Sequence, residues 1–582
     1  MAPSLSFEAA IYRSAGSGSS GGRNSIACSS RLETHRVSST RRRALCCALD
    51  ITRDNVATAA VATATAFPRI DHVEQQRLGI LPFLENKRIL ITGATGFLGK
   101  VLVEKILRAQ PKVSKIYLLV HADSHEKARQ RLEKDILESR LFELIREEYG
   151  ADYRQFMLEK LVAIPGSVEK NDLGLEKHTK EQLLSQLDVV VNSAATTKFF
   201  ERYDVALAVN TKGPLNLLEF AKKCSRLQLF LHVSTAYSNG LRQGRILEKP
   251  LASMSNGIAP PLDVWKEIDS VRNIKATSEE LKELGMQRAQ LHGWQDTYVF
   301  TKAMGETLVT QSRGDVPVVI LRPSVVEGTS AQPFGGWIQG TRMMDPMLLA
   351  YGLGHLTGFY ADPDCVLDVI PADMVVNSLL AAMSVHAGRP GLSVYHVGSS
   401  TVNPLTFREL AVCTEEYFQS NPVLDENGNP VERRMTFYDN KLAFSVHKFL
   451  CYSLPIHVRP PNFLALNSCY SFQVARLSGS RKLQNSAKRT AILAERLDQL
   501  VETYSAYTFY KGRFDITNTK TLYEQMLPEE KEGFGFDIGS IRWNEYITNV
   551  HLPGLRKNNR STFNTKFRLI TMKESIQGLF AV

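Results

Sequence analysis

Tyr298 and Lys302, in the string YVFTK, are spaced so that they can act together in acid–base chemistry. Residues four apart lie on one face of a helix, so both side chains point the same way. A phenol can donate a proton to a carbonyl oxygen, and a nearby ammonium stabilises the phenolate that is left behind. The YxxxK pattern is frequent by chance, and two surface residues of a helix are the alternative, so its meaning depends on the residues upstream.

The string TGATGFLG at 92–99 follows a predicted strand and opens a predicted helix. Its glycines lie where the backbone must turn tightly and approach a pyrophosphate, and the helix N-terminus presents its positive dipole end to the phosphates. The spacing is GxxGxxG rather than GxGxxG, and a structural turn is the alternative, but the strand and helix around it favour a dinucleotide site. The predicted cofactor contacts here are Thr92, Gly93, Thr95, Gly96, Phe97, Leu98 and Gly99.

A third residue of the predicted site, beside the tyrosine and the lysine, carries a hydroxyl group. The apolar run at 229–235 predicts a strand that ends in Thr235. Ligands of open α/β sheets bind at the carboxyl ends of strands, so Thr235, Tyr298 and Lys302 can converge beside a nicotinamide. We expect Tyr298 to protonate the carbonyl oxygen as hydride arrives, Thr235 to steady that oxygen, and Lys302 to lower the pKa of the phenol and bind the nicotinamide ribose. Glu306, one turn further, is predicted to be a solvated helix residue.

The end of the second predicted strand bears on the choice of cofactor. NAD enzymes usually place an acidic residue there, where it binds the ribose hydroxyls. Here the strand ends in Val120 and His121, and Asp123 lies two residues beyond. Lys127 and Arg129 follow on the next helix and favour a site for a 2′-phosphate. The sequence therefore predicts NADPH, with His121 as a cofactor contact; a partly exposed loop residue is the alternative for His121.

Short β-branched runs alternate with amphipathic segments from residue 87 onward, and these elements must position the chemistry. Near-continuous apolar runs indicate strands that are buried on both faces. Alternation of strand and helix predicts an α/β fold with a doubly wound parallel Rossmann sheet. The segments 100–110 and 211–224 carry apolar residues at helical spacing. The predicted strands are 88–92, 115–120, 160–166, 188–194, 229–235 and 317–323.

The chain divides into five predicted regions. A chain of 582 residues exceeds the size at which one core usually stops growing. Residues 401–465 lose the alternation and contain Pro and Asn-Gly turns, which favours a connector or a poorly ordered insertion. The regions are a transit peptide or disordered arm at 1–65, a Rossmann reductase domain at 80–400, the connector at 401–465, a smaller and mainly helical C-terminal domain at 466–558, and an atypical tail at 559–582.

The formal net charge is +10, and part of it lies in residues 1–50, which hold seven Arg and no Lys against three acidic residues. The excess positive charge of the rest of the chain is therefore small, and a nucleic-acid partner is not predicted. The eight cysteines form no CxxC pair and no array with metal spacing, so no metal site is predicted.

The first 50 residues are rich in Ser and Arg, poor in acidic residues, and lack the apolar centre of a signal peptide. This composition is typical of a plastid transit peptide, and a disordered arm without targeting function is the alternative. No run of 18 or more apolar residues follows, so no transmembrane anchor is predicted, while peripheral contact with a membrane is left open.

Seven strings between residues 80 and 400 occur in an order that is typical of one family. They are GATGFLGK (93–100), TTKFFERYDVALAVNTKGPLNLLEFAKKC (196–224), HVSTAYSNG (232–240), YVFTKAMGE (298–306), LRPSVVEGT (321–329), PFGGWIQGTRMMDP (333–346) and LTGFYADPDCVLDVIPADMVVN (356–377). SAYTFYKGRFDITNT (505–519) continues the series in the C-terminal domain. The chain thus resembles the plant fatty acyl-CoA reductase or male-sterility family of extended short-chain dehydrogenases, and its N-terminus is similar to the plastid branch.

The resemblance implies NADPH-dependent reduction of a fatty acyl thioester, on acyl carrier protein or CoA, to a primary alcohol by two hydride transfers. It also implies a role in pollen-wall or other extracellular lipid. Thr235 matches the active-site hydroxyl residue of the family, Tyr298 and Lys302 match its catalytic pair, and Asn210 matches an asparagine near the active site. Ala194, Ala195 and Pro323 complete the predicted cofactor contacts.

Some residues depart from the family pattern, and two other functions stay open. His121 stands where many members have an arginine for the 2′-phosphate, and the segments 445–470 and 556–582 do not resemble the usual ending. The alternatives are a nucleotide-sugar epimerase or dehydratase, which shares the glycine turn and YxxxK, and a non-catalytic NADP-binding regulatory protein. The sequence predicts neither the acyl chain length nor the oligomeric state.

Overall fold

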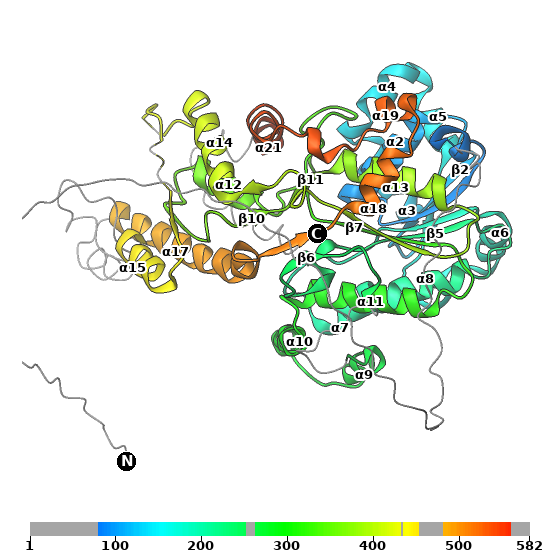
Figure 1. Ribbon diagram of the computed structural model, residues 1–582, viewed down its shortest axis with the longest axis horizontal. Coiled ribbons are helices and arrows are strands. Elements are labelled where there is room, and N and C mark those ends of the chain that lie inside the picture. The colour runs from blue at the N-terminus through cyan, green and yellow to red at the C-terminus, as the bar shows by residue number, and fades with distance from the viewer. Residues whose placement is uncertain are drawn as a thin grey trace, which may run out of the picture. The chain divides into compact units, whose positions relative to one another are not determined.

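A seven-stranded parallel sheet in the order β12-β7-β5-β4-β1-β2-β3 lies at the centre of the fold (Figure 1). The predicted doubly wound sheet is therefore confirmed, and β12 is a strand that the sequence reading did not name. The strands are β1 (Arg88–Thr92), β2 (Lys115–Val120), β3 (Leu161–Pro165), β4 (Val189–Asn192), β5 (Leu229–Val233), β7 (Val318–Pro323) and β12 (Leu392–Val397).

The computed structural model describes residues 79–251, 262–425, 427–431, 433, 435–452 and 481–559, and for 481–493 and 496 it gives only the course of the helix. All of these belong to one compact unit that begins at Gln75. The predicted transit peptide at 1–65 lies outside the described residues, as do 453–465 of the predicted connector and 560–582 of the predicted tail.

Helices cover both faces of the sheet (Figure 1). On one face α2 (Phe97–Ala109) packs against α13 (Ala372–His386), and on the other α8 (Gly213–Ala221) packs against α11 (Thr297–Ser312). Alternate residues of each strand enter two separate cores: Ile89 and Ile91 face the first, and Leu90 faces the second. Burial on both faces is the reason that the strands read as continuous apolar runs.

Shorter elements connect and extend this sandwich. The remaining helices of the N-terminal part are α1 (Ile80–Leu84), α3 (His125–Leu132), α4 (Glu143–Tyr149), α5 (Tyr153–Lys160), α6 (Lys177–Gln186), α7 (Tyr203–Ala206), α9 (Val264–Ser270), α10 (Ser278–Leu291) and α12 (Asp345–Gly352). The short strands are β6 (Gly244–Ile246), β8 (Val325–Glu327), β9 (Gly358–Tyr360), β10 (Val366–Leu367), β11 (Val369–Pro371), β13 (Leu405–Thr406) and β14 (Thr436–Tyr438).

The C-terminal part is mainly helical, as predicted, and is built onto the sheet. Its strand β15 (Gly512–Phe514) pairs with β6, and α18 (Thr517–Glu524) packs against β12 and α13. The other elements are α17 (Arg481–Thr508), α19 (Pro528–Gly533), α20 (Trp543–Glu545), the π-helical η10 (Tyr546–His551) and α21 (Leu552–Asn558). The C-terminal part therefore completes the covering of the β12 edge.

The prediction of a connector at 401–465 is wrong for its described residues. They form α14 (Phe407–Ser420), β14, which pairs with β9, and α15 (Lys441–Tyr452), which packs against α17. Helix α14 starts with a capping box in which Thr406 accepts from the backbone of Glu409 and Glu409 accepts from that of Thr406. The capping box is a local signal of a helix start. In the sequence analysis, the Pro and Asn-Gly turns further along the chain outweighed this signal and favoured a connector.

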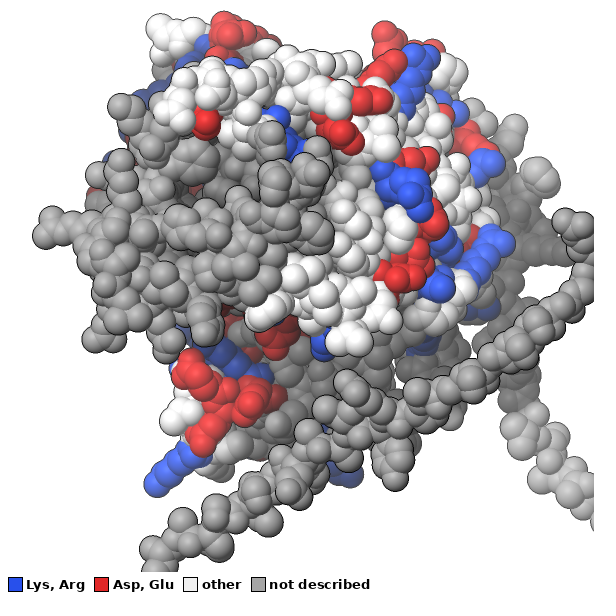
Figure 2. Space-filling model, turned by 90° about the vertical axis from the view of Figure 1, so that its left-hand side faces the viewer, with Lys and Arg blue, Asp and Glu red and all other residues white. Residues whose placement is uncertain are grey.

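Acidic and basic side chains are interspersed on the face that Figure 2 displays. Ion pairs at the surface, such as Arg408 with Asp364 and Lys448 with Asp498, place the two signs side by side. Among the described residues, no helix has the length and apolar character needed to cross a membrane.

Candidate active site

A cavity of about 780 Å³ opens at the carboxyl ends of β1, β4, β5 and β7. This volume is in the range of small-molecule sites, and the place is the one where open α/β sheets bind their ligands. Fourteen of the fifteen predicted site residues line it: Thr92, Gly93, Thr95, Gly96, Phe97, Leu98, Gly99, His121, Ala194, Ala195, Thr235, Tyr298, Lys302 and Pro323.

The glycine turn between β1 and α2 forms a cradle that larger residues would fill. Gly93 has a φ of +69°, and a Cβ atom there would lie 2.6 Å from the carbonyl oxygen of Ser193. Gly96 donates its N–H to the Gly93 oxygen at 3.0 Å and caps α2 without any side-chain hydrogen bond. The first N–H groups of α2 thus have no side-chain cap at the edge of the cavity, and this arrangement fits the diphosphate of a dinucleotide.

Thr92 fixes the loop opposite the cradle. Its hydroxyl donates to Asn192 Oδ1 at 2.8 Å and accepts from the backbone N–H groups of Ser193 and Ala194 at 3.2 and 3.1 Å. These bonds join the ends of β1 and β4. They hold Ala194 and Ala195 at the cavity wall.

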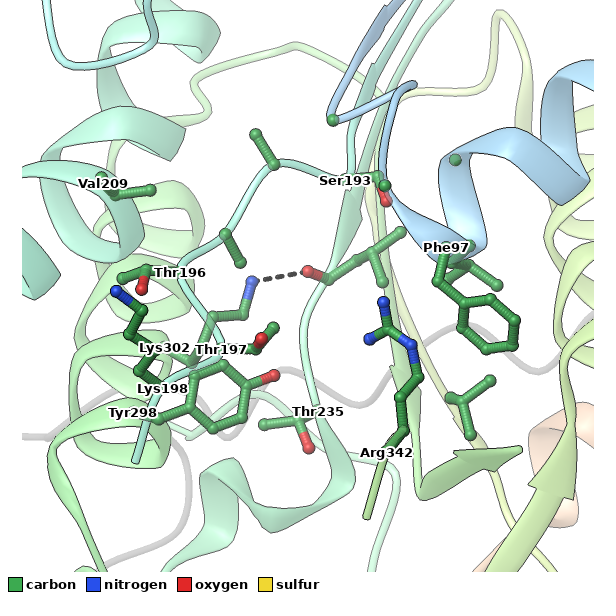
Figure 3. Close-up of a pocket in the computed structure, with 18 of the residues that line it drawn as sticks. Phe97, Ser193, Thr196, Thr197, Lys198, Val209, Thr235, Tyr298, Lys302 and Arg342 are labelled. Atoms are coloured by element: carbon green, nitrogen blue, oxygen red, sulfur yellow. Dashed lines mark hydrogen bonds between the residues drawn. The ribbon is translucent and has the colours of Figure 1, made fainter. Parts of the chain in front are cut away.

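The hydroxyl of Thr235 is oriented at the end of β5. Its oxygen accepts a hydrogen bond from the N–H of Tyr237 at 3.3 Å, which leaves the hydroxyl proton free to be donated to a ligand. The neighbouring Ser234 also lines the cavity, and its buried hydroxyl has no hydrogen-bond partner among the described residues. The geometry therefore offers a hydroxyl donor beside Tyr298 (Figure 3).

Lys302 reaches the same region from α11. The side chain is 2% exposed and its Nζ donates to the carbonyl oxygen of Val233 at 2.7 Å (Figure 3). Burial lowers the pKa of this ammonium to about 8, and the carboxylate of Glu306 opposes that shift.

The phenol of Tyr298 is partly exposed, and it lines the cavity. Burial and then the carboxylate of Asp296 raise its pKa above the ordinary value. The sequence predicts that Lys302 lowers this pKa, and the direction in this structure is the opposite, because burial and the Asp296 carboxylate disfavour the phenolate. The phenol therefore carries its proton at neutral pH, which is the form that a general acid needs.

Glu306 is fully buried, so the prediction of a solvated residue is wrong. Its carboxylate accepts from Nε of the equally buried Arg322 at 3.0 Å and pairs with a second nitrogen of the same guanidinium. Arg322 also contacts Nε2 of His396 at 3.0 Å. The face of α11 that carries Lys302 and Glu306 packs on the sheet, and YxxxK spacing alone does not show which face is covered.

Asn210 is the one predicted site residue that does not line the cavity. Its amide donates to the carbonyl oxygen of Thr196 at 3.0 Å and to the hydroxyl of Thr301 at 3.1 Å, and its oxygen accepts from the N–H of Thr196 at 3.0 Å. All of these bonds join the loop after β4 to α11. The structure places Asn210 beneath the site, as a residue that positions it.

Arg131, rather than Lys127 or Arg129, is the basic residue of the cavity lining near the end of β2, and it also pairs with Asp135 at 3.1 Å. Arg131 lines the cavity and donates to the hydroxyl of Thr95 at 2.9 Å and to the carbonyl oxygen of His121 at 3.3 Å. Lys127 pairs with Asp123 and Arg129 pairs with Glu126 on the exposed face of α3, outside the cavity lining. Arg131 follows Lys127 by four residues and Arg129 by two, and the sequence analysis did not name it.

Helix α17 of the C-terminal part forms one wall of the cavity that Tyr298 lines. The hydroxyl of Tyr507 donates to Asp296, which in turn caps α11 by accepting from the N–H of Val299 at 2.9 Å. Sequence reasoning did not predict the contact between Tyr507 and Asp296, since 211 residues separate them along the chain. The lining residues from α17 are Gln499, Leu500, Thr503, Tyr504 and Tyr507.

The parallel sheet, the glycine cradle and the Thr-Tyr-Lys set define an oxidoreductase of the extended short-chain dehydrogenase class. Residues 91–379 and 472–561 both match family profiles described as male sterility protein. The chain belongs to the fatty acyl-CoA reductase family.

Two named plant relatives carry this assignment. "Fatty acyl-CoA reductase 2, chloroplastic" of Arabidopsis thaliana is 47% identical over 505 residues, which cover 83% of this chain and 80% of the relative. "Alcohol-forming fatty acyl-CoA reductase" of Simmondsia chinensis is 38% identical over 496 residues, which cover 82% of this chain and 98% of the relative. The reductase domain of a non-ribosomal peptide synthetase from Mycobacterium tuberculosis aligns at 20% identity with a TM-score of 0.49, over 81% of this chain and 93% of that one.

Proposed function

We propose that this protein reduces fatty acyl thioesters to primary fatty alcohols with NADPH. The observation that carries the proposal is the meeting of Thr235, Tyr298 and Lys302 at the end of β5, beside the glycine cradle and in one cavity. The relative named alcohol-forming supports the alcohol as the product.

The residues of this chain have distinct roles in the reaction. The reduced nicotinamide, when bound, supplies one hydride to the carbonyl carbon in each of two rounds. Tyr298 donates its proton to the carbonyl oxygen in each round, and the Thr235 hydroxyl stabilises the charge on that oxygen. In the first round the hydride and the proton give a hemithioacetal; its C–S bond then breaks, the hydroxyl proton passes to the sulfur, the thiol leaves and an aldehyde forms. Tyr298 regains a proton from solvent, and in the second round the aldehyde becomes the alcohol. Lys302 binds the nicotinamide ribose. Its ammonium places a positive charge beside the phenol, which stabilises the phenolate after proton transfer.

NADPH is the proposed cofactor because Arg131 stands at the end of β2. A guanidinium suits a 2′-phosphate, since it is permanently charged and donates several hydrogen bonds. His121 and Thr95 lie in contact with Arg131 and complete the adenosine end.

The proposed carrier of the acyl group is acyl carrier protein or CoA, and the proposed compartment is the plastid. The transit-like composition of residues 1–50 and the chloroplastic name of one relative support the compartment. The description "male sterility protein" of the matching family supports a product for the pollen wall. Peripheral membrane contact would deliver so apolar a product.

Product analysis tests this proposal. The protein from residue 75 onward is incubated with NADPH and acyl-ACP, acyl-CoA or UDP-sugar, and products are identified by mass spectrometry. We expect fatty alcohol from a thioester and two NADPH consumed per alcohol. An altered sugar would instead show an epimerase or dehydratase, and NADPH binding without any turnover would show a regulatory protein.

A further inference from the structure

Arg342 lies at the N-terminal end of α2 and has one donor without an acceptor in the part of the chain that the structure describes. Its guanidinium stacks on the ring of Phe97, the first residue of α2, at 4.8 Å from the ring centre. Nε donates to the carbonyl oxygen of Gln339 at 2.7 Å, while Nη2 is buried and has no partner among the described residues. Figure 3 shows the guanidinium directed into the cavity lining, across from Tyr298.

Basic side chains lie near this end of the cavity, together with the carboxylates of Asp135, Asp345 and Glu327. Lys100 on α2 is buried, and its pKa is lowered first by burial and then by the charges of Arg131 and Arg342, against the opposing effect of Asp135. A buried charged donor without an acceptor is unfavourable. The uncapped N-terminus of α2 adds N–H groups at the same place. A doubly charged anion such as a diphosphate satisfies the Arg342 donor and these N–H groups together.

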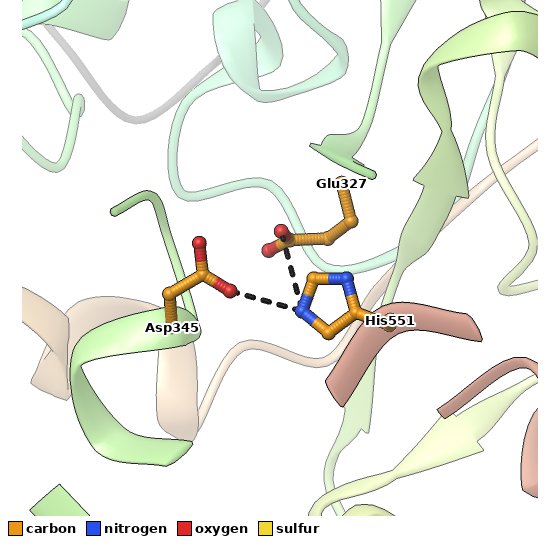
Figure 4. A group of neighbouring side chains, drawn as sticks. All are labelled: Glu327, Asp345 and His551. Atoms are coloured by element: carbon orange, nitrogen blue, oxygen red, sulfur yellow. Dashed lines mark hydrogen bonds and ion pairs between the residues drawn. The ribbon is translucent and has the colours of Figure 1, made fainter. Parts of the chain in front are cut away.

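The C-terminal part holds the segment that carries Arg342. The backbone N–H of Arg342 donates to Asp345 Oδ2 at 2.7 Å, and Asp345 Oδ1 lies 2.9 Å from Nε2 of His551 in η10 (Figure 4). Glu327 lies 3.9 Å from the same nitrogen and accepts from the N–H of Met344 at 3.4 Å.

This network is isolated from solvent and supports a strained backbone. Glu327, Asp345 and His551 are at most 1% exposed. Nδ1 of His551 has no partner among the described residues, so the proton belongs on Nε2, where it meets Asp345. Met343, directly after Arg342, has a φ of +39°, which a non-glycine residue adopts only when its surroundings impose it.

We propose that Arg342 binds the diphosphate of the dinucleotide cofactor and that His551, through Asp345, fixes the loop that presents it. The proposal rests on the proposed use of a nicotinamide dinucleotide. Under this proposal the C-terminal part has two roles. It positions a residue that binds the cofactor, and through α17 it lines the end of the cavity where the substrate would bind.

Cofactor binding without any acyl substrate tests the role of Arg342. Dissociation constants for NADPH and NADH are measured by titration of intrinsic and nicotinamide fluorescence for Arg342→Gln, Arg342→Lys and Arg131→Gln. We expect Arg342→Gln to weaken both cofactors by a similar factor of about 10 to 100, and Arg342→Lys to weaken both less. Arg131→Gln should weaken NADPH alone. Arg408→Gln, which removes an exposed ion pair, is the matched control.

Two results would overturn the proposal for Arg342. One is an unchanged dissociation constant for both cofactors in Arg342→Gln. The other is an effect confined to the KM of the acyl thioester, because the anion bound by Arg342 would then be a phosphate of the carrier. Fatty alcohol production tests the proposed function separately. A protein that binds NADPH without forming alcohol would contradict the proposed function and leave the role of Arg342 in cofactor binding intact.

The His551 contact is tested with His551→Ala and His551→Gln. Alanine removes the donor to Asp345, whereas glutamine keeps an N–H donor, so we expect weaker binding of both cofactors in the first and partial recovery in the second. In combination with Arg342→Gln, His551→Ala should add little to the loss. A folded His551→Ala protein with unchanged cofactor binding, or losses that add fully, would refute the positioning role.

Discussion

At the scale of single residues, the site consists of groups whose surroundings fix their protonation. Tyr298 keeps its proton because burial and Asp296 disfavour the phenolate. Lys302 is a buried cation that is held by the Val233 carbonyl. Thr235 has its oxygen occupied and its proton free. In the proposed reaction, a protonated phenol, a free hydroxyl proton and a buried cation together stabilise negative charge on one oxygen.

Tyr298→Phe removes one hydroxyl and keeps the ring. Loss of a positioned general acid typically lowers the rate by about 10²–10⁴-fold, and both the thioester and the aldehyde need a proton on oxygen. We expect kcat to fall by such a factor in both reductions, with NADPH binding and thermal unfolding nearly unchanged. Thr235→Ser, which keeps the hydroxyl, serves as the control. A folded Tyr298→Phe enzyme with the wild-type rate would contradict the mechanism.

Arg131→Gln should change the cofactor preference. It removes the guanidinium beside His121 and Thr95 and leaves the glycine cradle intact. We expect kcat/KM for NADPH to fall about 10- to 100-fold, as for a charge-assisted contact, and that for NADH to change little. Lys127→Gln, on the exposed face of α3, should leave the ratio of the two values unchanged. Equal losses with both cofactors would assign Arg131 to another part of the ligand.

The pH profile should report Lys302. Because burial lowers its pKa to about 8, the ammonium loses its proton as pH rises through this value, and activity should decline there. Above about 8 and up to the ordinary lysine pKa of about 10.4, the unfolded chain binds more protons at this residue, so its contribution to folding stability rises with pH. Thr235→Ala should keep the same alkaline limb at a lower rate. A flat profile between pH 7 and 9.5 would remove Lys302 from the catalytic set.

At the scale of elements, the predicted and the unpredicted features divide by sequence distance. The strands and the glycine turn follow from local apolar runs and spacing, and so they could be read from the sequence. Two contacts join segments about 200 residues apart, that of Asp296 with Tyr507 and that of Asp345 with His551. No local sequence pattern predicts such pairs. The burial of Glu306 and the folding of 401–452 into α14 and α15 likewise depend on what packs against them.

Tyr507→Phe tests how α17 is joined to α11. The substitution removes the donor to the buried Asp296 carboxylate, a bond to a charged group that contributes about 1.5–3 kcal/mol. We expect the free energy of unfolding in urea to fall by such an amount at pH 8, where Asp296, with a pKa raised to about 6, is ionised. Near pH 4 the protonated Asp296 needs this donor less, so the loss should shrink. An equal loss at both pH values would show that Tyr507 acts through packing alone.

At the scale of the whole molecule, the two ends of the chain should respond differently to truncation. The compact unit begins at Gln75, so removal of residues 1–74 should preserve alcohol formation and the thermal unfolding midpoint. Truncation after residue 480 removes β15 from β6, uncovers β12 and deletes His551, so that protein should fail to fold or to bind NADPH. Residues 1–65 fused to a fluorescent protein should enter plastids in leaf cells. A truncated 75–480 protein that is monomeric, folded and bound to NADPH would show that the sheet is self-sufficient, and it would contradict the positioning role of the C-terminal part in cofactor binding.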